Sequence, residues 1–282
     1  MSIWSVCMKS PVSFKLSKQL IPGLILILMA QSVKAETLNL YVQPIASVSV
    51  TVRTFKPLAD YLSEKIGQPV QIRTASNFFA YWQSMRSGTG FDLVLDAAHF
   101  TDYRVKRYGY KVLVKIPDTV SYSLVSRQDL LLFDAQELLG RTVATAASPS
   151  LGGVRLAEIF PNPVRQPTVI QANNFQSALD KLRKGEIDAA LVPTPLVSND
   201  NTVNTVMTTM PVPHMALSIS PKLKPKTGQM IRQALLNASH DARGQSMLQE
   251  INISSFEKSN NAVYDGYSDL LSEIWGYDPG PR

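Results

Sequence analysis

Apolar positions repeat along this chain with two different spacings, and the two spacings alternate in a regular order. Short runs that are apolar throughout or at every second position predict strands, and apolar residues three or four apart predict helices. From residue 38 to residue 116 the order is strand, helix, strand, helix, strand, helix, strand. This order is typical of an α/β fold with a parallel sheet covered by helices on both faces. The strands are predicted at residues 38–43, 69–73, 91–95 and 110–116, and the helices at 54–66, at about 78–85 after a Ser76 or Asn77 cap, and at about 100–108.

A second α/β set of about the same size begins near residue 135, and extended segments lie on either side of it. Two such sets joined by extended segments predict two lobes with a cleft, each lobe a mostly parallel sheet flanked by helices. The second extended segment would return the chain to the first lobe. The set has predicted strands at 141–146, 168–171 and 187–192, and the extended segments lie at 122–127 and 203–210. The predicted divisions are 36–120 for the first part of lobe 1, 121–210 for lobe 2, and 211–282 for the lobe 1 return and the C-terminal helices.

The first 35 residues have the order of a secretory signal peptide. Three lysines precede an apolar run at residues 20–30, and residues 33–35 resemble a small-x-small cleavage site. The run is shorter than the roughly 20 residues that a membrane span needs, so an uncleaved anchor is the less favoured alternative. We predict a signal peptide at residues 1–35, cleavage near Ala35, and a soluble mature protein in the periplasm.

Cleavage would change the charge balance of the chain. The whole sequence has 28 Lys and Arg against 22 Asp and Glu, a formal net charge of +6. Four of the lysines and none of the acids lie in residues 1–35, which leaves 24 basic residues and a net charge of +2. A nucleic-acid partner therefore has little support. The single cysteine, Cys7, lies in the same segment, so the mature chain would have no disulfide and no cysteine metal site.

Residues 141–160 contain the strongest candidate for a binding site. A strand ends at a Ser-Pro-Ser turn, two glycines follow, and a helix begins. The N-terminus of a helix offers free N–H groups and a partial positive charge, and both favour an anion. The alternative is a capped strand-to-helix loop that binds nothing. The candidate ligand-binding residues of this loop are Ser148, Ser150, Gly152 and Gly153.

Further candidates lie at strand ends, where parallel α/β sheets bind their ligands. Ser47 follows the first strand, and Thr194 follows the strand at 187–192. His99 follows the third strand and could donate a hydrogen bond to an oxyanion, with a capping or surface histidine as the alternative. Tyr122 begins a crossing strand, where it would face the cleft or else pack on the hinge.

The sequence contains no recognisable catalytic constellation. Its three histidines lack metal-ligand spacing, and neither a GxSxG motif nor a Walker loop occurs. We therefore expect no enzyme activity, no cofactor and no metal site. Arg155 lies one turn into the helix of the candidate loop, and its side chain can point away to solvent.

Three stretches of the chain resemble one known family. FKPLADYLSEKIGQPVQIRTA, FDLVLDAAHFTDYRV and SPSLGGVR are similar to segments of the phosphate/phosphite/phosphonate ABC-transporter substrate-binding proteins. The resemblance covers most of residues 37–220. It implies a type 2 periplasmic binding protein with two α/β lobes and a hinge. It also implies an oxyanion held at the start of the second-lobe helix, here at residues 148–152.

These observations favour a binding protein that closes two lobes on a small oxyanion, such as phosphate, phosphite or a phosphonate, for an ABC permease in the inner membrane. The alternative is a solitary binding protein that reports its ligand to a membrane sensor kinase. Neighbouring permease and ATPase genes would separate the two hypotheses. Both take a small-molecule anion as the partner, and a monomer is expected. A periplasmic enzyme is a third class, and the lack of a catalytic constellation counts against it.

Overall fold

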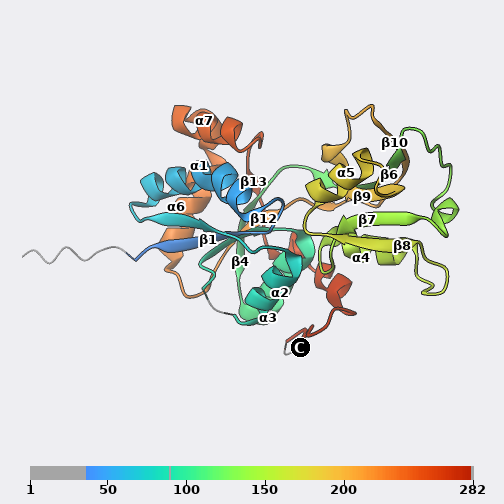
Figure 1. The fold of residues 1–282 in the computed structure, drawn as a ribbon. Helices are drawn as coiled ribbons and strands as arrows, with labels where there is room; N and C mark the ends of the chain where they lie inside the picture. The colour runs from blue at the N-terminus through green and yellow to red at the C-terminus, as the bar shows by residue number, and fades with distance from the viewer. Residues whose placement is uncertain (1–35, 89, 281–282) are drawn as a thin grey trace, which may run out of the picture. The chain divides into compact units, whose positions relative to one another are not determined.

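The computed structural model describes residues 36–88 and 90–280, which form two large β-sheets and one short β-ribbon (Figure 1). The predicted signal peptide, its cleavage site at Ala35 and Cys7 lie outside the described residues. Within the described ranges, no helix combines the length and the hydrophobicity that a transmembrane helix needs.

The first sheet has the strand order β13-β4-β12-β3-β1-β2. β1 pairs in parallel with β2 on one side and with β3 on the other. β12 lies between β3 and β4 and is antiparallel to both, so a strand from late in the chain completes a sheet begun by the first third. The strands are β1 (Leu38–Val42), β2 (Val70–Arg73), β3 (Leu93–Asp96), β4 (Lys111–Lys115), β12 (Ala216–Ile219) and β13 (Glu257–Lys258).

Helices cover both faces of the first sheet. The side chains of β3 point alternately to the two faces, so their contacts show which helices cover which face. Leu93 and Leu95 belong to one core with α1, α6 and α7, whereas Val94 belongs to another with α2 and α3. The helices are α1 (Val48–Ile66), α2 (Phe78–Arg86), α3 (Ala98–Tyr108), α6 (Pro225–Leu236) and α7 (Ala242–Glu250).

The second sheet has the order β10-β6-β9-β7-β8. β7 is parallel to β8 and β9, while β6 is antiparallel to β9 and to β10. α4 and α5 are the two α-helices of this part. The elements are β6 (Tyr122–Arg127), β7 (Thr142–Ala146), α4 (Leu151–Ile159), β8 (Thr168–Ala172), α5 (Phe175–Arg183), β9 (Ala189–Pro193) and β10 (Val203–Thr208).

Two short antiparallel strands connect the sheets. β5 (Thr119–Val120) leads into β6, and β11 (Val212–Pro213) follows β10 on the way back to β12. Val212 pairs with Val120, and Pro213 pairs with Thr119, so the two crossing segments form one ribbon. This ribbon is the candidate hinge. The division of the chain into lobes at residues 120/121 and 210/211 stays a prediction.

The α/β fold class is confirmed, and both sheets prove to be mixed in strand direction. The local order of elements cannot reveal that β12 inserts beside β3, because that pairing joins segments about 120 residues apart. The second set opens with a single 3₁₀ turn, and four further 3₁₀ turns are present in the described ranges. The 3₁₀ turns are η1 (Ala135–Leu138), η2 (Thr194–Leu196), η3 (Ala238–His240), η4 (Asn261–Tyr264) and η5 (Tyr267–Leu271).

The start of α1 differs most from its prediction, because the helix begins at Val48 and not at residue 54. Residues 48–53 are rich in β-branched residues, and Pro57 lies inside the helix, where it offers no N–H to the carbonyl four residues earlier. Both features disfavour a helix locally. Tertiary burial decides the outcome, since Thr51 and Phe55 are buried in this segment.

The C-terminal segment packs on α2 and α3. The indole N–H of Trp82 donates to the Trp275 carbonyl at 3.0 Å, and the Asp102 carboxylate accepts from the Ser268 amide at 2.8 Å. This packing fixes α2 and α3, whose buried residues share one cluster with residues of the second sheet.

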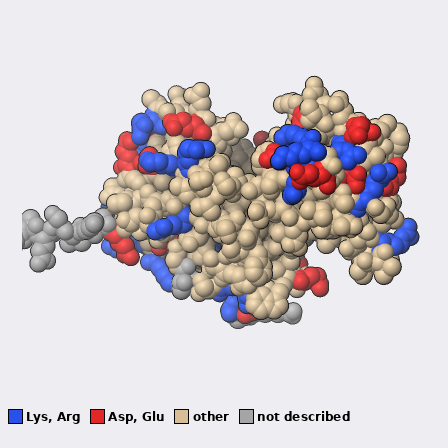
Figure 2. Space-filling model, in the orientation of Figure 1, with Lys and Arg blue, Asp and Glu red and all other residues tan. Residues whose placement is uncertain are grey.

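Charged side chains of both signs lie close together on the face shown in Figure 2, over both parts of the molecule. Ion pairs occur among the described residues, such as Arg183 with Asp200 at 2.7 Å and Lys181 with Glu186 at 3.1 Å. Opposite charges in these pairs therefore neutralise one another locally.

Candidate anion-binding site

The loop between β7 and α4 has the geometry of a capped helix start. Ser150 is the N-cap of α4, and its buried hydroxyl oxygen accepts from the Gly153 amide at 3.0 Å. The same hydroxyl donates to the Ala146 carbonyl at 2.6 Å. Its one proton is therefore used within the loop. Ser148, by contrast, is exposed, so its hydroxyl is the more accessible of the two.

The two glycines that follow are required by close packing. A Cβ on Gly152 would lie 2.3 Å from Thr145 Oγ1 and 2.6 Å from a ring carbon of Phe175. A Cβ on Gly153 would lie 2.8 Å from the backbone nitrogen of Ser148. The two glycines thus let the first turn of α4 pack closely against the preceding loop and against α5. This packing gives a structural reason for the two glycines, which the sequence analysis interpreted as part of a ligand-binding loop.

His99 connects the first sheet to this loop. It lies in the first turn of α3 and is fully buried, and its Nε2 is 3.0 Å from the Pro149 carbonyl oxygen. A carbonyl can only accept, so Nε2 carries the proton and donates. His99 is thus neither a surface histidine nor a side-chain cap. Its Nδ1 is buried and has no hydrogen-bond partner in the described part of the chain.

Burial lowers the pKa of His99 to about 4, so the imidazole is neutral in the folded protein near pH 7. The unfolded chain binds this proton near pH 6.5. The His99 contribution to stability is therefore fully present above about pH 6.5 and is lost as the pH falls towards 4. Burial has the same effect on His214, whose pKa is also lowered to about 4.

We expect His99→Gln to reduce this pH dependence, because Gln can keep a donor for the Pro149 carbonyl but does not titrate. Urea unfolding of the purified protein between pH 4.5 and 7.5 measures the effect. The slope of unfolding free energy against pH should fall by up to one proton relative to the unsubstituted protein. An unchanged slope would show that His99 does not remain neutral in the fold.

Aromatic rings from α2, α5 and β6 meet beside the loop. Phe175, the first residue of α5, packs edge-on against Tyr122 at 5.5 Å and against Phe78 of α2 at 5.8 Å between ring centroids. All three side chains are buried. Burial raises the pKa of Tyr122 well above its usual value, so its hydroxyl stays neutral. Tyr122 is therefore a buried residue that packs against the first residue of α5, and whether it binds ligand stays a prediction.

Arg155 was not among the predicted ligand-binding residues. Its guanidinium does not extend into solvent: Nη1 pairs with Glu158 at 2.6 Å, Nη2 donates to the Met210 carbonyl at 3.4 Å, and the side chain is only 14% exposed. Its Nε is buried with no partner among the described residues. The one feature of the sequence that could have identified Arg155 is its position, one turn into the helix that follows the candidate anion loop.

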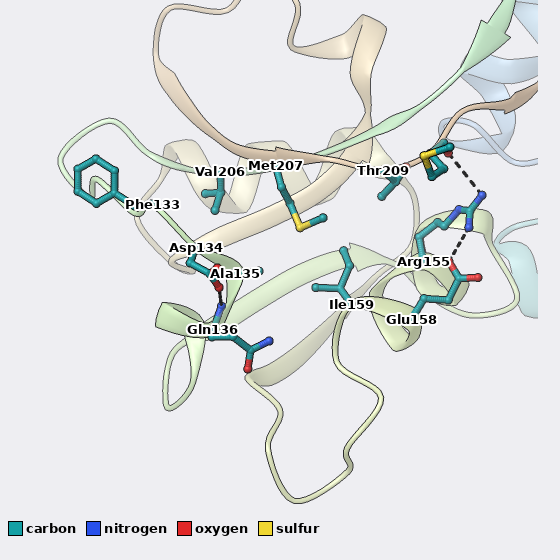
Figure 3. Close-up of a pocket in the computed structure, with 11 residues that line it drawn as sticks. Phe133, Asp134, Ala135, Gln136, Arg155, Glu158, Ile159, Val206, Met207 and Thr209 are labelled. Carbon is teal, nitrogen blue, oxygen red and sulfur yellow. Dashed lines mark hydrogen bonds and ion pairs between the residues drawn. The ribbon is translucent and has the colours of Figure 1, made fainter.

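Arg155 also lines one end of a groove of about 490 Å³ on the second-sheet part (Figure 3). The rest of the groove has both apolar and polar lining residues, with Ile159 from α4 and Met207 from β10 projecting into it and Asp134 and Glu158 among the polar ones. Arg155 thus lines this groove, and its positive charge also acts on the buried Tyr122 and His99, for both of which burial has the larger effect on the pKa.

The remaining two candidates are placed differently. The Thr194 hydroxyl lies 2.9 Å from the hydroxyls of both Ser121 and Ser123, next to the β6–β9 pairing in which Tyr122 faces Pro193. Ser47 is exposed at the start of α1, and its side chain makes no capping hydrogen bond to that helix. Contacts therefore join the 148–153 loop with His99, and join Tyr122 with the Phe175 ring that covers Gly152. Whether any of the candidate residues binds ligand stays a prediction.

Groups of His, Asp, Glu or Cys suited to a metal ion do not occur in residues 36–88 or 90–280. The donors at the candidate site are backbone amides, hydroxyls and one guanidinium, which are groups that bind an anion.

Two mixed α/β sheets joined by a two-stranded crossing ribbon define the class of type 2 periplasmic binding proteins, and solved members of that class share the fold. Residues 40–264 match the sequence model of one family, described as ABC transporter, phosphonate, periplasmic substrate-binding protein. The chain belongs to this family, which is a substrate-binding component of a transporter.

Solved structures agree with this assignment at the level of the fold. PhnD1 from Prochlorococcus marinus in complex with methylphosphonate has a TM-score of 0.74 at 13% identity, over 84% of this chain and 98% of that one. A binding protein component of an ABC phosphonate transporter from Pseudomonas aeruginosa has a TM-score of 0.73 at 13% identity, over 84% and 85%. A Xanthomonas citri protein bound to ATP has a TM-score of 0.67 at 16% identity, over 85% and 100%. No curated protein sequence matches the chain.

Proposed function

We propose that this protein captures a small oxyanion of the phosphate, phosphite or phosphonate class in the periplasm and presents it to an ABC permease. The observation that carries the proposal is the hydrogen bond from His99 to the Pro149 carbonyl. It brings the start of α4 to the contact between the two sheets, where a ligand at the loop would touch both. The family favours the transporter over the sensor alternative.

The anion would be held by groups of this chain alone. The amides of Leu151 and Gly152 are in the first turn of α4, where N–H groups lack partners within the helix. The Ser148 hydroxyl is accessible, and Arg155 supplies a positive charge one turn further along. Pro149 has no N–H to give. The ligand is thus bound by a hydroxyl, helix amides and a guanidinium.

Binding would be coupled to movement at the β5–β11 ribbon. Access to the amides of the buried Leu151 and Gly152 would require the His99–Pro149 hydrogen bond and the Phe78–Phe175 contact to open. A ligand that contacts both sides favours the closed state by its differential affinity for that state.

A thermal-shift screen of the purified protein tests the proposal. The probes are inorganic phosphate, phosphite, methylphosphonate, sulfate and acetate. A ligand at 100 times its Kd stabilises the folded state by about 2.7 kcal/mol, so a phosphorus oxyanion should raise the melting temperature clearly. If sulfate or acetate stabilises and no phosphorus oxyanion does, the proposed ligand class is wrong.

Two serine variants separate ligand contact from helix capping. We expect Ser148→Ala to weaken oxyanion binding about tenfold, since a hydrogen bond to a charged group contributes about 1.5–3 kcal/mol. Its folding stability should be unchanged because the hydroxyl is exposed. Ser150→Ala should lower the unfolding free energy by about 1 kcal/mol through the lost cap. Titration calorimetry and urea unfolding measure the two quantities.

The matched control is Ser246→Ala, because Ser246 is exposed on α7 and bonds only locally to Glu250. It should match the unsubstituted protein in both measurements. A Ser148→Ala variant that binds as tightly as this control would place the anion away from the loop.

A further inference from the structure

Gln43 is a buried polar residue that lies directly after β1 and is only 5% exposed. Its side-chain oxygen accepts from the Ala97 amide at 3.1 Å, and its side-chain nitrogen donates to the Met215 sulfur, also at 3.1 Å. A backbone amide can only donate, so the Ala97 contact settles which end of the carboxamide is the oxygen. One side chain therefore joins three segments: the end of β1, the start of α3 and the crossing segment before β12.

The contact with Ala97 replaces a cap that α3 does not supply itself. Ala97 is the N-cap of α3 and makes no side-chain capping bond. In a capping box, a Glu or Gln at the third helical position accepts from the N-cap amide, but that position in α3 is Phe100. Gln43 provides the acceptor from another element. It thereby holds the first turn of α3, from which His99 donates to the Pro149 carbonyl.

The contact with Met215 reaches the root of the candidate hinge. Met215 lies between β11 and β12, where the second crossing segment arrives at the first sheet, and it is 8% exposed. Its carbonyl accepts at 3.0 Å from the amide of Ile116, which directly follows β4 on the first crossing segment. Its own amide donates to His214 Nδ1 at 2.7 Å. The residue that Gln43 contacts is thus bonded to both crossing segments.

We infer that Gln43 is a positioning residue for the oxyanion site, because it ties the start of α3, which carries His99, to the root of the β5–β11 ribbon. The inference rests on the proposed function and assigns a further residue to the same site. When the ribbon bends, this side chain keeps the first turn of α3 in place against Met215, so that closure returns His99 to the Pro149 carbonyl. Gln43 acts through His99 and not by contact with the ligand.

Titration of His99 tests the positioning directly. Gln43→Met removes the bond to Ala97 and the donor to Met215, and it keeps a side chain of similar length. Burial holds the pKa of His99 at about 4 in the unsubstituted protein. In Gln43→Met, the displaced imidazole should titrate at least about one pH unit higher, towards the 6.5 of an exposed histidine.

Proton NMR of the imidazole signals between about pH 5 and 8 measures this midpoint. The chain has three histidines, so the His99→Gln variant identifies the signal of His99 by its loss. The charged groups that act on His99 are Asp96, Arg155 and Arg104, and none of them is changed in the experiment. A purely structural role of Gln43 would lower stability without moving the midpoint.

The binding rates give the second measurement, with inorganic phosphate and methylphosphonate as the probes. In surface plasmon resonance, Gln43→Met should release a bound probe about tenfold faster and change the association rate less, because the closed state is held less well. Met215→Leu keeps the apolar volume and removes only the thioether acceptor, so it should give a smaller effect in the same direction. The double variant should bind no more weakly than Gln43→Met alone, because both changes break the same contact.

Gln71→Met is the matched control, because Gln71 in β2 is half-buried and its side chain donates to the Asn39 side chain at 2.9 Å. It should leave the His99 midpoint and both rates unchanged. If Gln43→Met fails to fold, Met215→Leu decides, and it must speed release by at least about threefold for the inference to stand.

The outcomes separate this inference from the proposed function. An unchanged His99 midpoint in Gln43→Met overturns the inference alone, as does a release rate equal to that of the Gln71→Met control. If the unsubstituted protein binds neither phosphate, phosphite nor methylphosphonate, the proposed function is wrong and the inference fails with it.

Discussion

Arg104→Met is expected to lower the unfolding free energy by about 3–5 kcal/mol, which is the usual effect of removing one partner of a buried ion pair. The side chains of Arg104 and Asp96 are at most 1% exposed and are bonded to each other. Without the guanidinium, the Asp96 carboxylate would remain buried and would keep only the neutral donors of Tyr81 and Thr101. Urea unfolding at pH 7 measures the loss.

An exposed pair supplies the control for this prediction. Lys56 and Asp60 form an ion pair in α1 with side chains 67% and 48% exposed. Lys56→Met should change the unfolding free energy by less than about 1 kcal/mol. The double variant Asp96→Asn with Arg104→Met should recover much of the stability, because no buried charge is left without a partner. A loss below about 1 kcal/mol for Arg104→Met would mean that Asp96 is not held as a charged group.

The buried pair also bears on the site. Asp96 ends β3, and its carboxylate accepts from Thr101 in the first turn of α3, the turn that contains His99. The ion pair therefore fixes the helix start from which His99 reaches the Pro149 carbonyl. We expect variants of Arg104 to weaken oxyanion binding through this displacement as well as through stability.

Local signals in the sequence were enough to place most single elements. β6 runs from Tyr122 to Arg127 as predicted, and Asn77 caps α2 with a hydrogen bond to the Ala80 amide. The reason is that period, capping and glycine stops act within a few residues. The position of β12 in the first sheet and the early start of α1 depend on distant packing, and neither could be read locally.

The candidate site also has features that local sequence signals predict and features that depend on distant contacts. The β7–loop–α4 unit was predictable, because a turn of small residues before an amphipathic helix is a local pattern. The contact of His99 with Pro149 joins residues 50 apart, and that of Phe78 with Phe175 joins residues 97 apart. No periodicity in the sequence specifies such contacts. The contact of Arg155 with the Met210 carbonyl could not be predicted for the same reason, since Met210 follows β10 and lies 55 residues away in the sequence.

Gly152→Ala is expected to destabilise the protein, although the same change in a helix usually stabilises it. Alanine in a helix interior is normally favoured over glycine by about 0.5–1 kcal/mol. Here the new Cβ would lie 2.3 Å from Thr145 Oγ1 and 2.6 Å from Phe175 Cε1. Thr145 donates to the Leu191 carbonyl at 2.7 Å in the buried second sheet, so it has little freedom to move.

The expected loss for Gly152→Ala is about 1–3 kcal/mol from overpacking, with a further loss of similar size if the Leu191 carbonyl loses its donor. Gly228→Ala is the matched control, because Gly228 lies in α6 and its Cβ would meet Ile219 and Leu113 at ordinary contact distances of 3.4 and 3.5 Å. That control should gain about 0.5–1 kcal/mol. Urea unfolding of both variants should therefore give changes of opposite sign. If both are stabilised, the first turn of α4 can move away from Phe175, and Gly152 is not required there by close packing.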